Sequence, residues 1–241
     1  MQKHFELADN ATVTYWRTEG RLGDILFPEQ KIELKGAEKL RGGAQVCSPI
    51  FGDMPTTKDY LGITLPKHGV MRTGASYSSR FRHTKNSGSD SLIFTYEHPW
   101  PHQVAVTVTT SPTGDTLTHT VIASDRGADK IPLSIGFHPY FATNGKAFTI
   151  LNGDIEVTSA TIETDKPFFI ECAESKKVLL KFTDGHIVEM KLEAGYERCC
   201  IWTDATEKYI CIEPVMGGAG QYTFLHHGDA PLVCTCILRV Y

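Results

Sequence analysis

The chain has 241 residues, of which 41% are hydrophobic and 22% charged, and its net charge is −4. These values are ordinary for a globular protein, and the length is sufficient to bury a large core without disulfides or metals. An acidic chain with no long basic run is a poor partner for nucleic acid, and no apolar run approaches the ~18 residues of a membrane span. The start, MQKHFELADN, contains no apolar signal-peptide core.

Seven cysteines are present, an odd number, and they form no C-x-x-C motif. Cys199 and Cys200 are adjacent, and Cys234 and Cys236 share one face of a predicted strand. We expect the reduced, mostly buried thiols of a cytoplasmic protein rather than a zinc site.

Strand-like segments begin early in the chain. Thr12–Arg17 alternates apolar and polar residues, Gly20–Pro28 leads through a turn into a short apolar segment, and Lys31–Leu34 is a further candidate strand. Residues 39–52 read K-L-R-G-G-A-Q-V-C-S-P-I-F-G, and the glycine pair permits unusual backbone angles and close approach of a ligand. Residues 53–66, interrupted by Pro and Gly, are expected to form a loop.

The remaining chain predicts many short strands separated by turns. Asp184–Gly185 is the strongest hairpin signal. No linker-like change in composition and no repeat divides the chain, so we expect one all-β domain over residues 1–241, a sandwich or a barrel. The expected strands are Ala75–Arg82, Ser91–Glu97, Gln103–Thr110, Thr116–Ser124, Ser134–Phe141, Lys177–Phe182, His186–Leu192, Cys199–Thr203, Tyr209–Val215 and Leu232–Tyr241.

The segment Ser134–Phe141, S-I-G-F-H-P-Y-F, carries the first candidate for chemistry. Its period of two puts His138 and Tyr140 on one face and Phe137 on the other. Pro139 cannot donate to a ladder, so we expect the strand to end there or to lie at an edge. A histidine among aromatic rings suits a sugar site, with ring faces for the sugar and one proton donor for chemistry. The alternative is a structural histidine.

Three further segments contain polar residues in unusual surroundings. Glu213 lies inside the apolar Y-I-C-I-E-P-V, where a carboxylate is costly unless it is paired or functional. Arg41 precedes the glycine pair, and His68 and Arg72 flank a glycine in K-H-G-V-M-R. Each has a structural alternative: an ion pair with Arg72 for Glu213, a loop position without a role for His68, and a solvated side chain for Arg41.

Taken together, the motifs R-G-G-x-x-V-x-x-P-x-F-G, H-G-x-x-R, G-F-H-P-Y-F and C-I-E-P resemble the aldose 1-epimerase family. The particular likeness is to its shorter bacterial branch and to the hexose-6-phosphate mutarotases, over residues from about 39 to 216. The resemblance implies an all-β fold, an antiparallel β-sandwich of the galactose mutarotase-like supersandwich type. It also implies a sugar cleft on the concave face of one sheet, and neither a metal ion nor an organic cofactor.

The resemblance assigns expected roles by motif. His138 matches the general acid, Glu213 the general base and His68 the second active-site histidine of the family. Arg41 and Arg72 match substrate-side arginines of related branches.

Two features depart from the family pattern. Val-Met replaces the more usual aromatic-small pair inside H-G-x-x-R, which would reshape one wall of the pocket. No motif fixes the sugar-binding aspartate. Asp204 in W-T-D is the candidate. Tyr140 is a further expected substrate contact.

The expected function is interconversion of the α and β anomers of an aldohexose. Opening the hemiacetal requires a base at the C1 hydroxyl and an acid at the ring oxygen, so we expect His138 and Glu213 on opposite sides of one cleft, a sugar ring apart. Three alternatives stay open: a glucose-6-phosphate 1-epimerase, a non-catalytic carbohydrate-binding protein on the same scaffold, and a sugar lyase sharing the sandwich. The expected partner is a small sugar or sugar phosphate, and the expected state a monomer or homodimer.

Overall fold

The computed structural model describes residues 3–7, 13–17, 26, 30–34, 37–53, 67–69, 79–86, 89–96, 102–110, 115–126, 130–217, 223–226 and 228–241. None of these segments forms a helix that could span a membrane. Apart from a 3-10 turn at Ser159–Thr161, the regular structure in these ranges is strand. The strands are β1 (Lys3–Leu7), β2 (Val13–Arg17), β3 (Gln30–Leu34), β4 (Ala37–Arg41), β5 (Ala44–Cys47), β6 (Ser79–Asn86), β7 (Ser89–Tyr96), β8 (His102–Thr110), β9 (Thr116–Asp125), β10 (Lys130–Leu133), β11 (Gly136–Ala142), β12 (Phe148–Asn152), β13 (Ile155–Thr158), β14 (Phe168–Glu171), β15 (Lys177–Phe182), β16 (Ile187–Ala194), β17 (Arg198–Trp202), β18 (Tyr209–Val215), β19 (Thr223–His226) and β20 (Leu232–Val240).

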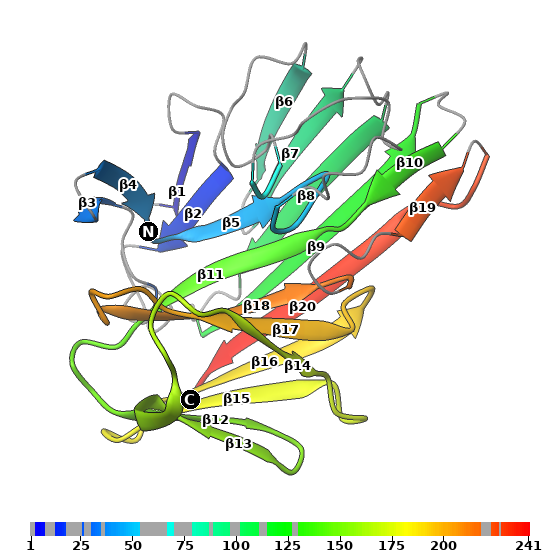
Figure 1. Cartoon of the computed structure of the whole chain (residues 1–241). Helices are drawn as coiled ribbons and strands as arrows, with labels where there is room; N and C mark the ends of the chain where they lie inside the picture. The colour runs from blue at the N-terminus through cyan, green and yellow to red at the C-terminus, as the bar shows by residue number, and fades with distance from the viewer. Residues whose placement is uncertain are drawn as a thin grey trace.

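Two large sheets form the layers of a sandwich (Figure 1). The seven-stranded sheet has the order β1-β2-β5-β11-β18-β17-β14, and the nine-stranded sheet has the order β13-β12-β15-β16-β20-β9-β8-β7-β6. Two small sheets, β3-β4 and β10-β19, complete the described part. Every recorded strand pairing is antiparallel, which confirms the expected antiparallel β-sandwich. A single domain over residues 1–241 stays a prediction.

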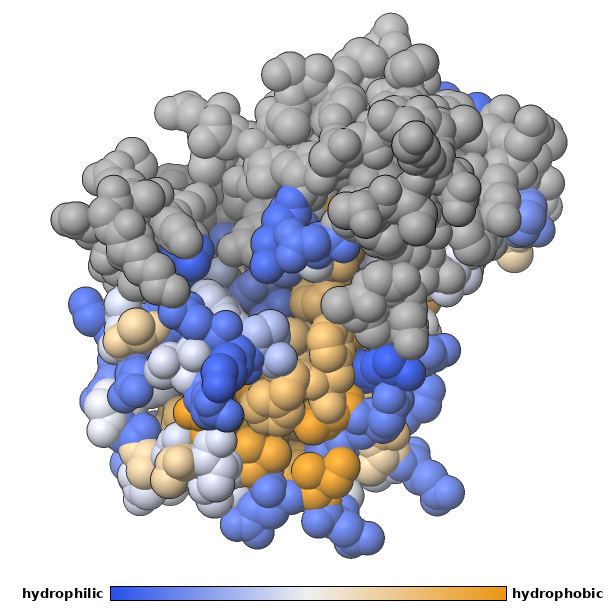
Figure 2. Space-filling model, viewed as in Figure 1, coloured by the Kyte–Doolittle hydropathy of each residue, from blue (hydrophilic) through white to orange (hydrophobic). Residues whose placement is uncertain are grey.

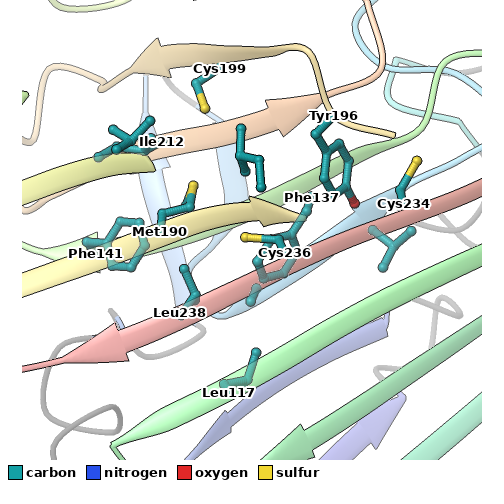
Figure 3. Packing of buried hydrophobic residues seen from close by; sticks show 14 of the residues in the cluster. Leu117, Phe137, Phe141, Met190, Tyr196, Cys199, Ile212, Cys234, Cys236 and Leu238 are labelled. Atoms are coloured by element: carbon teal, nitrogen blue, oxygen red, sulfur yellow. The ribbon is translucent and has the colours of Figure 1, made fainter. Parts of the chain in front are cut away.

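The main core lies between the two large sheets. Phe137, Phe141 and Ile212 of the seven-stranded sheet pack with Met190 and Leu238 of the nine-stranded sheet (Figure 3). Because side chains alternate along a strand, this packing turns the neighbouring residues of β11 and β18 to the other face of the seven-stranded sheet. The period-two prediction for Ser134–Phe141 is therefore confirmed.

The surface of the described part is mixed. In Figure 2, apolar side chains gather near the centre of the lower half of the molecule, with hydrophilic side chains around them. Six of the seven cysteines are buried, Cys172 is half-buried, and none forms a disulfide, as the sequence predicts.

The predicted hairpin at Asp184–Gly185 is also confirmed. β15 and β16 pair on either side of it, and Gly185 has a φ of +93°, in the left-handed region that glycine adopts without strain. The loop expected at residues 53–66 lies, apart from Asp53, outside the described residues.

Candidate active site

The two residues expected to act as acid and base lie side by side, on the face of the seven-stranded sheet turned away from the core. The register of β11 and β18 pairs Tyr140 with Cys211, which sets His138 opposite Glu213 two positions along. Nε2 of His138 and Oε2 of Glu213 are 3.3 Å apart, and only 3% and 2% of the two side chains is exposed. A carboxylate is costly to bury alone, so this contact explains how an apolar strand tolerates Glu213.

The expectation that a sugar ring would separate the two groups is wrong. Directly opposed residues on one face of antiparallel neighbours have Cβ atoms only ~4.5–5.5 Å apart. The sequence shows neither which strands are neighbours nor their register. Contact still suits the chemistry, because the C1 hydroxyl oxygen and the ring oxygen of a hemiacetal are bonded to the same carbon.

A proline follows each member of this pair. The backbone N–H of Tyr140 donates to the carbonyl of Gly43 on the β5 side at 2.9 Å, so the preceding residue, Pro139, faces β18, where it has no N–H to donate. By the same alternation Pro214 faces β11, and the recorded pairing of the two strands is interrupted between positions 136 and 140. The expectation that Pro139 ends a strand or lies at an edge is therefore wrong. β11 is a central strand, and the missing donors fall where its ladder with β18 is open.

Aromatic rings surround His138. The Tyr140 ring stacks on it with a centroid distance of 4.6 Å and an interplanar angle of 11°. Trp202 and His68 meet it edge-on, with centroids 6.2 Å and 5.5 Å away. These contacts fix the plane of the imidazole beside Glu213, with Nε2 3.3 Å from Oε2 of that residue.

The structure brings His68 to the same group, across a long sequence separation. Its backbone N–H donates to the carbonyl of Gly52 at 2.8 Å, and the backbone N–H of Gly52 donates back to Nδ1 of His68 at 3.2 Å. A ring nitrogen that accepts a hydrogen bond carries no proton, so the neutral imidazole has its proton on Nε2. His68 is therefore arranged as a hydrogen-bond donor through Nε2.

Gly69, directly after His68, lies against the backbone of Ser48, and its replacement is expected to be costly. Gly69 has a φ of +75°, and an added Cβ would lie 2.2 Å from the carbonyl oxygen of Ser48. We expect Gly69→Ala to lower the free energy of unfolding by about 1–3 kcal/mol, measured by urea unfolding. Gly145→Ala is the matched control, because Gly145 has the same φ of +75° with nothing within 4 Å. Equal losses in the two variants would show that the backbone absorbs the collision at Gly69.

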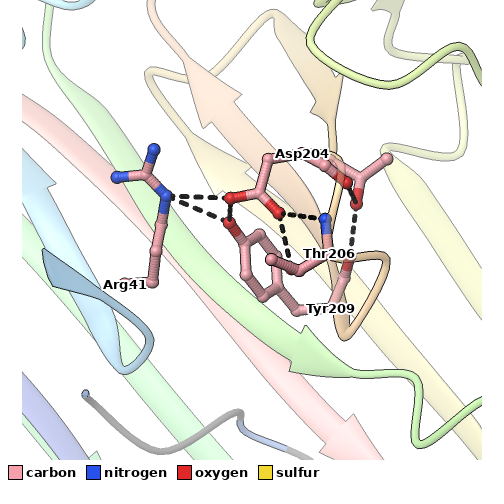
Figure 4. Close-up of polar contacts among 5 residues, drawn as sticks. Arg41, Asp204, Thr206 and Tyr209 are labelled. Atoms are coloured by element: carbon pink, nitrogen blue, oxygen red, sulfur yellow. Dashed lines mark hydrogen bonds and ion pairs between the residues drawn. The ribbon is translucent and has the colours of Figure 1, made fainter. Parts of the chain in front are cut away.

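A second polar group joins Arg41 to Asp204 (Figure 4). Nε of Arg41 donates to Oδ2 of Asp204 at 3.2 Å and to the Tyr209 hydroxyl at 3.0 Å. The Tyr209 hydroxyl donates to the same carboxylate oxygen. Thr206 donates to Oδ1 of Asp204 from its backbone N–H at 3.0 Å and from its hydroxyl at 2.6 Å. Both carboxylate oxygens thus accept hydrogen bonds from protein donors.

The ionisation of this group follows from its contacts. Burial alone would raise the pKa of Asp204, but hydrogen bonds from Thr206, Tyr209 and Arg41 outweigh it and hold the pKa below its usual value. Burial, followed by the hydrogen bond to Asp204, raises the pKa of Tyr209, so its phenol keeps its proton and remains a donor. Asp204 is therefore an anion that orients Arg41 and Tyr209.

Trp202 connects the two groups. Its ring lies 5.2 Å from the Arg41 guanidinium carbon, within range of a cation–π contact, and meets His138 edge-on. Of the predicted site residues, His68, His138, Tyr140 and Glu213 thus cluster directly, and Trp202 links Arg41 and Asp204 to that cluster. Arg72, and with it the alternative Glu213–Arg72 ion pair, lies outside the described residues.

Sequence reasoning missed Trp202, Tyr209 and Gln45. Trp202 stands two positions before Asp204 in W-T-D, and Tyr209 opens the strand that carries Glu213, so both signals were in the chain. Gln45 follows the R-G-G motif and pairs with His138 across β5 and β11.

One set of residues in the described part has ligand atoms close enough for a metal ion. The Nε2 or Nδ1, Sγ and carboxylate atoms of His138, Cys211 and Glu213 lie within 4.8 Å of one another, and all three residues are buried. Two of them are the expected acid and base, so a metal bound there would occupy the groups that the expected chemistry uses.

Comparison with known structures places this fold in a class. A crystal structure of a galactose mutarotase related enzyme from Lactobacillus acidophilus matches with a TM-score of 0.66 and 15% identity, over 100% of this chain and 97% of that one. Slr1438 protein from Synechocystis matches with a TM-score of 0.64 and 18% identity, over 84% and 79%. A galactose mutarotase-like protein from Lactobacillus casei matches with a TM-score of 0.63 and 14% identity, over 89% and 100%. The fold is thus the galactose mutarotase-like sandwich.

The family is shown by the sequence itself. The family model described as Aldose 1-epimerase matches residues 11–215, which include every motif that carries the resemblance. The chain belongs to the aldose 1-epimerase family, a family of isomerases, which supports a mutarotase-type activity. No curated protein matches the chain significantly.

Proposed function

We propose that the protein interconverts the α and β anomers of a free aldohexose, with His138 as general acid and Glu213 as general base. The observation that carries the proposal is the buried contact of 3.3 Å between Nε2 of His138 and Oε2 of Glu213, walled by the rings of Tyr140 and Trp202. Aromatic faces suit the apolar face of a sugar ring, and a matched acid and base suit ring opening rather than binding alone.

In the proposed reaction Glu213 takes the proton of the C1 hydroxyl while His138, as an imidazolium, gives a proton to the ring oxygen. The C1–ring-oxygen bond breaks, the electron pair of the O–H bond forms the aldehyde, and no covalent enzyme intermediate arises. An opposite charge beside an imidazole favours its protonated form, so each group supports the state the other needs. Rotation about C1–C2 and reversal of both transfers close the ring on the other face. The Nε2–H of His68 is the proposed donor to the aldehyde oxygen during rotation.

The environment of Arg41 supports a free sugar over a phosphorylated one. A phosphoryl group requires local cations, which arginine supplies through its planar fork. The Nε of Arg41 is engaged by Asp204 and Tyr209, and the carboxylate compensates its charge. The glucose-6-phosphate alternative would therefore need Arg72 as its cation. The choice between a free and a phosphorylated sugar is tested directly.

We expect Arg41→Ala to raise KM about 10-fold for a free hexose and for its 6-phosphate alike. The reason is that, in the proposed function, Arg41 of the wild-type protein contacts the sugar ring rather than a phosphate. Inorganic phosphate at millimolar concentration is expected not to inhibit the wild-type protein. Arg239→Ala, which removes an exposed arginine of the nine-stranded sheet, is the control. A rise in KM of Arg41→Ala for the 6-phosphate alone, together with inhibition of the wild-type protein by phosphate, would establish the phosphorylated substrate instead.

The proposed function itself is tested by NMR saturation transfer between anomers, over a panel of free and phosphorylated aldoses. Faster exchange of at least one free aldohexose supports the proposal. Binding of sugars without any acceleration of exchange would make the protein a carbohydrate-binding member of the family.

A cytoplasmic location and a monomeric or homodimeric state stay expectations. The location is expected because seven thiols without a disulfide suit a reducing compartment.

A further inference from the structure

Gln45 lies in the same transverse row as the proposed acid and base. β5 and β11 pair Gln45 with His138, and the β11–β18 register sets His138 opposite Glu213, so the three side chains share one face of the sheet. Neighbours in such a row have Cβ atoms about 4.5–5.5 Å apart. Gln45, His138 and Glu213 are buried to the same depth, at 1%, 2% and 2% exposure. A ligand that reaches the acid and base therefore also reaches Gln45.

The amide of Gln45 has a fixed orientation. Its Nε2 donates to the carbonyl oxygen of Gly42 at 3.3 Å. Turning the amide over would place its own oxygen against that carbonyl, which is a contact between two acceptors. The side chain therefore keeps Nε2 toward the R-G-G loop and directs Oε1 elsewhere.

Oε1 of Gln45 is a buried acceptor to which no donor among the described residues binds. Such groups are few in native proteins, and each costs stability unless something satisfies it. An apolar side chain at this position would avoid that cost. The retained acceptor, in line with a proposed acid and base, indicates a donor that arrives with the ligand.

We propose that Oε1 of Gln45 accepts a hydrogen bond from one hydroxyl of the sugar and selects substrates that carry this hydroxyl. The inference rests on the proposed function and adds a specificity-determining contact to it. A neutral amide oxygen attracts an O–H donor and repels the oxygens of a phosphoryl or carboxylate group. The position therefore recognises a neutral, hydroxylated part of the ring, and a sugar that lacks this hydroxyl leaves the buried acceptor unsatisfied.

The test compares wild-type protein and Gln45→Leu on an aldohexose and on its monodeoxy analogues, each lacking one of the hydroxyls other than that at C1. We expect Gln45→Leu to lower kcat/KM about 10-fold or more for the parent sugar. For one deoxy analogue, the one without the recognised hydroxyl, wild type and variant are expected to agree within about 3-fold. Gln45→Met, which keeps the length and removes the acceptor, is the second variant if Gln45→Leu does not fold.

Gln103→Leu is the control, since Gln103 lies on the nine-stranded sheet and donates to the Thr95 hydroxyl, and it is expected to change neither series. A loss in the Gln45 variants that is equal for every sugar would mean that Gln45 only holds the R-G-G loop, and would overturn the inference. The two proposals fail separately: absence of wild-type exchange on every aldose rejects the proposed function, whereas exchange with a uniform loss rejects only the role of Gln45.

Discussion

Replacing Glu213 by Gln is expected to lower kcat for anomer exchange by at least ~10², with the fold retained. The amide keeps the size of the side chain but cannot take the proton of the C1 hydroxyl. His138→Asn is expected to have an effect of the same order, because the ring oxygen then loses its proton donor. Rates are measured by NMR saturation transfer on the best substrate of the panel, and folding by circular dichroism.

Glu213 and His138 act on the two oxygens bonded to C1 of the sugar, so the losses of kcat in the two single variants are not expected to add. The double variant should be slower than the worse single variant by only a few-fold. Glu189→Gln is the control, because Glu189 belongs to an ion pair with Lys177 on the nine-stranded sheet, at 3.2 Å. Near-full activity in either single variant would remove that residue from the mechanism. Unfolding of both single variants would favour a structural ion pair.

The sequence predicts most of the strands because burial on one face produces a period of two. Strands β15 (Lys177–Phe182) and β18 (Tyr209–Val215) have the bounds that the sequence predicts. β5, Ala44–Cys47, was missed because all four of its residues are buried and no polar position alternates with an apolar one. β13 and β14 have only four residues each, too few for periodicity to separate a strand from a loop.

The composition of the site was predictable from motifs, and its geometry was not. His138 and Glu213 each precede a proline in a recognisable strand, but their contact depends on the pairing of β11 with β18, a tertiary property. The hydrogen bond between Arg41 and Asp204 joins residues separated by 163 positions. Gln45 is the extreme case, because its place beside His138 follows only from the pairing of β5 with β11.

A large expected effect of pH on stability concerns His119, which lies in the core between the sheets. It is fully buried, its ring stacks on Phe137 with a centroid distance of 4.0 Å, and it is paired across the sheet with Cys236. Burial lowers the pKa of His119 to about 3. Burial also raises the pKa of the Cys236 thiol, so this neighbour stays uncharged and does not support a charged imidazole.

Acidification is therefore expected to destabilise the fold through His119 between pH 6.5 and 3. In the unfolded chain a histidine takes up its proton near pH 6.5, whereas the folded protein resists this until about pH 3. The unfolded state binds more protons throughout that window, so the free energy of unfolding decreases as the pH is lowered. At pH 5 this group has removed about 2 kcal/mol relative to neutral pH. His119→Phe keeps a planar ring against Phe137 and removes the titration. Between pH 7 and pH 5, His119→Phe should lose about 2 kcal/mol less of its free energy of unfolding, measured in urea, than the wild-type protein. His226→Gln, at an exposed position, is the control and should lose as much as the wild-type protein. If His119→Phe and wild type lose the same stability between these pH values, His119 takes up its proton in the folded protein and its burial does not set the acid limit of the fold.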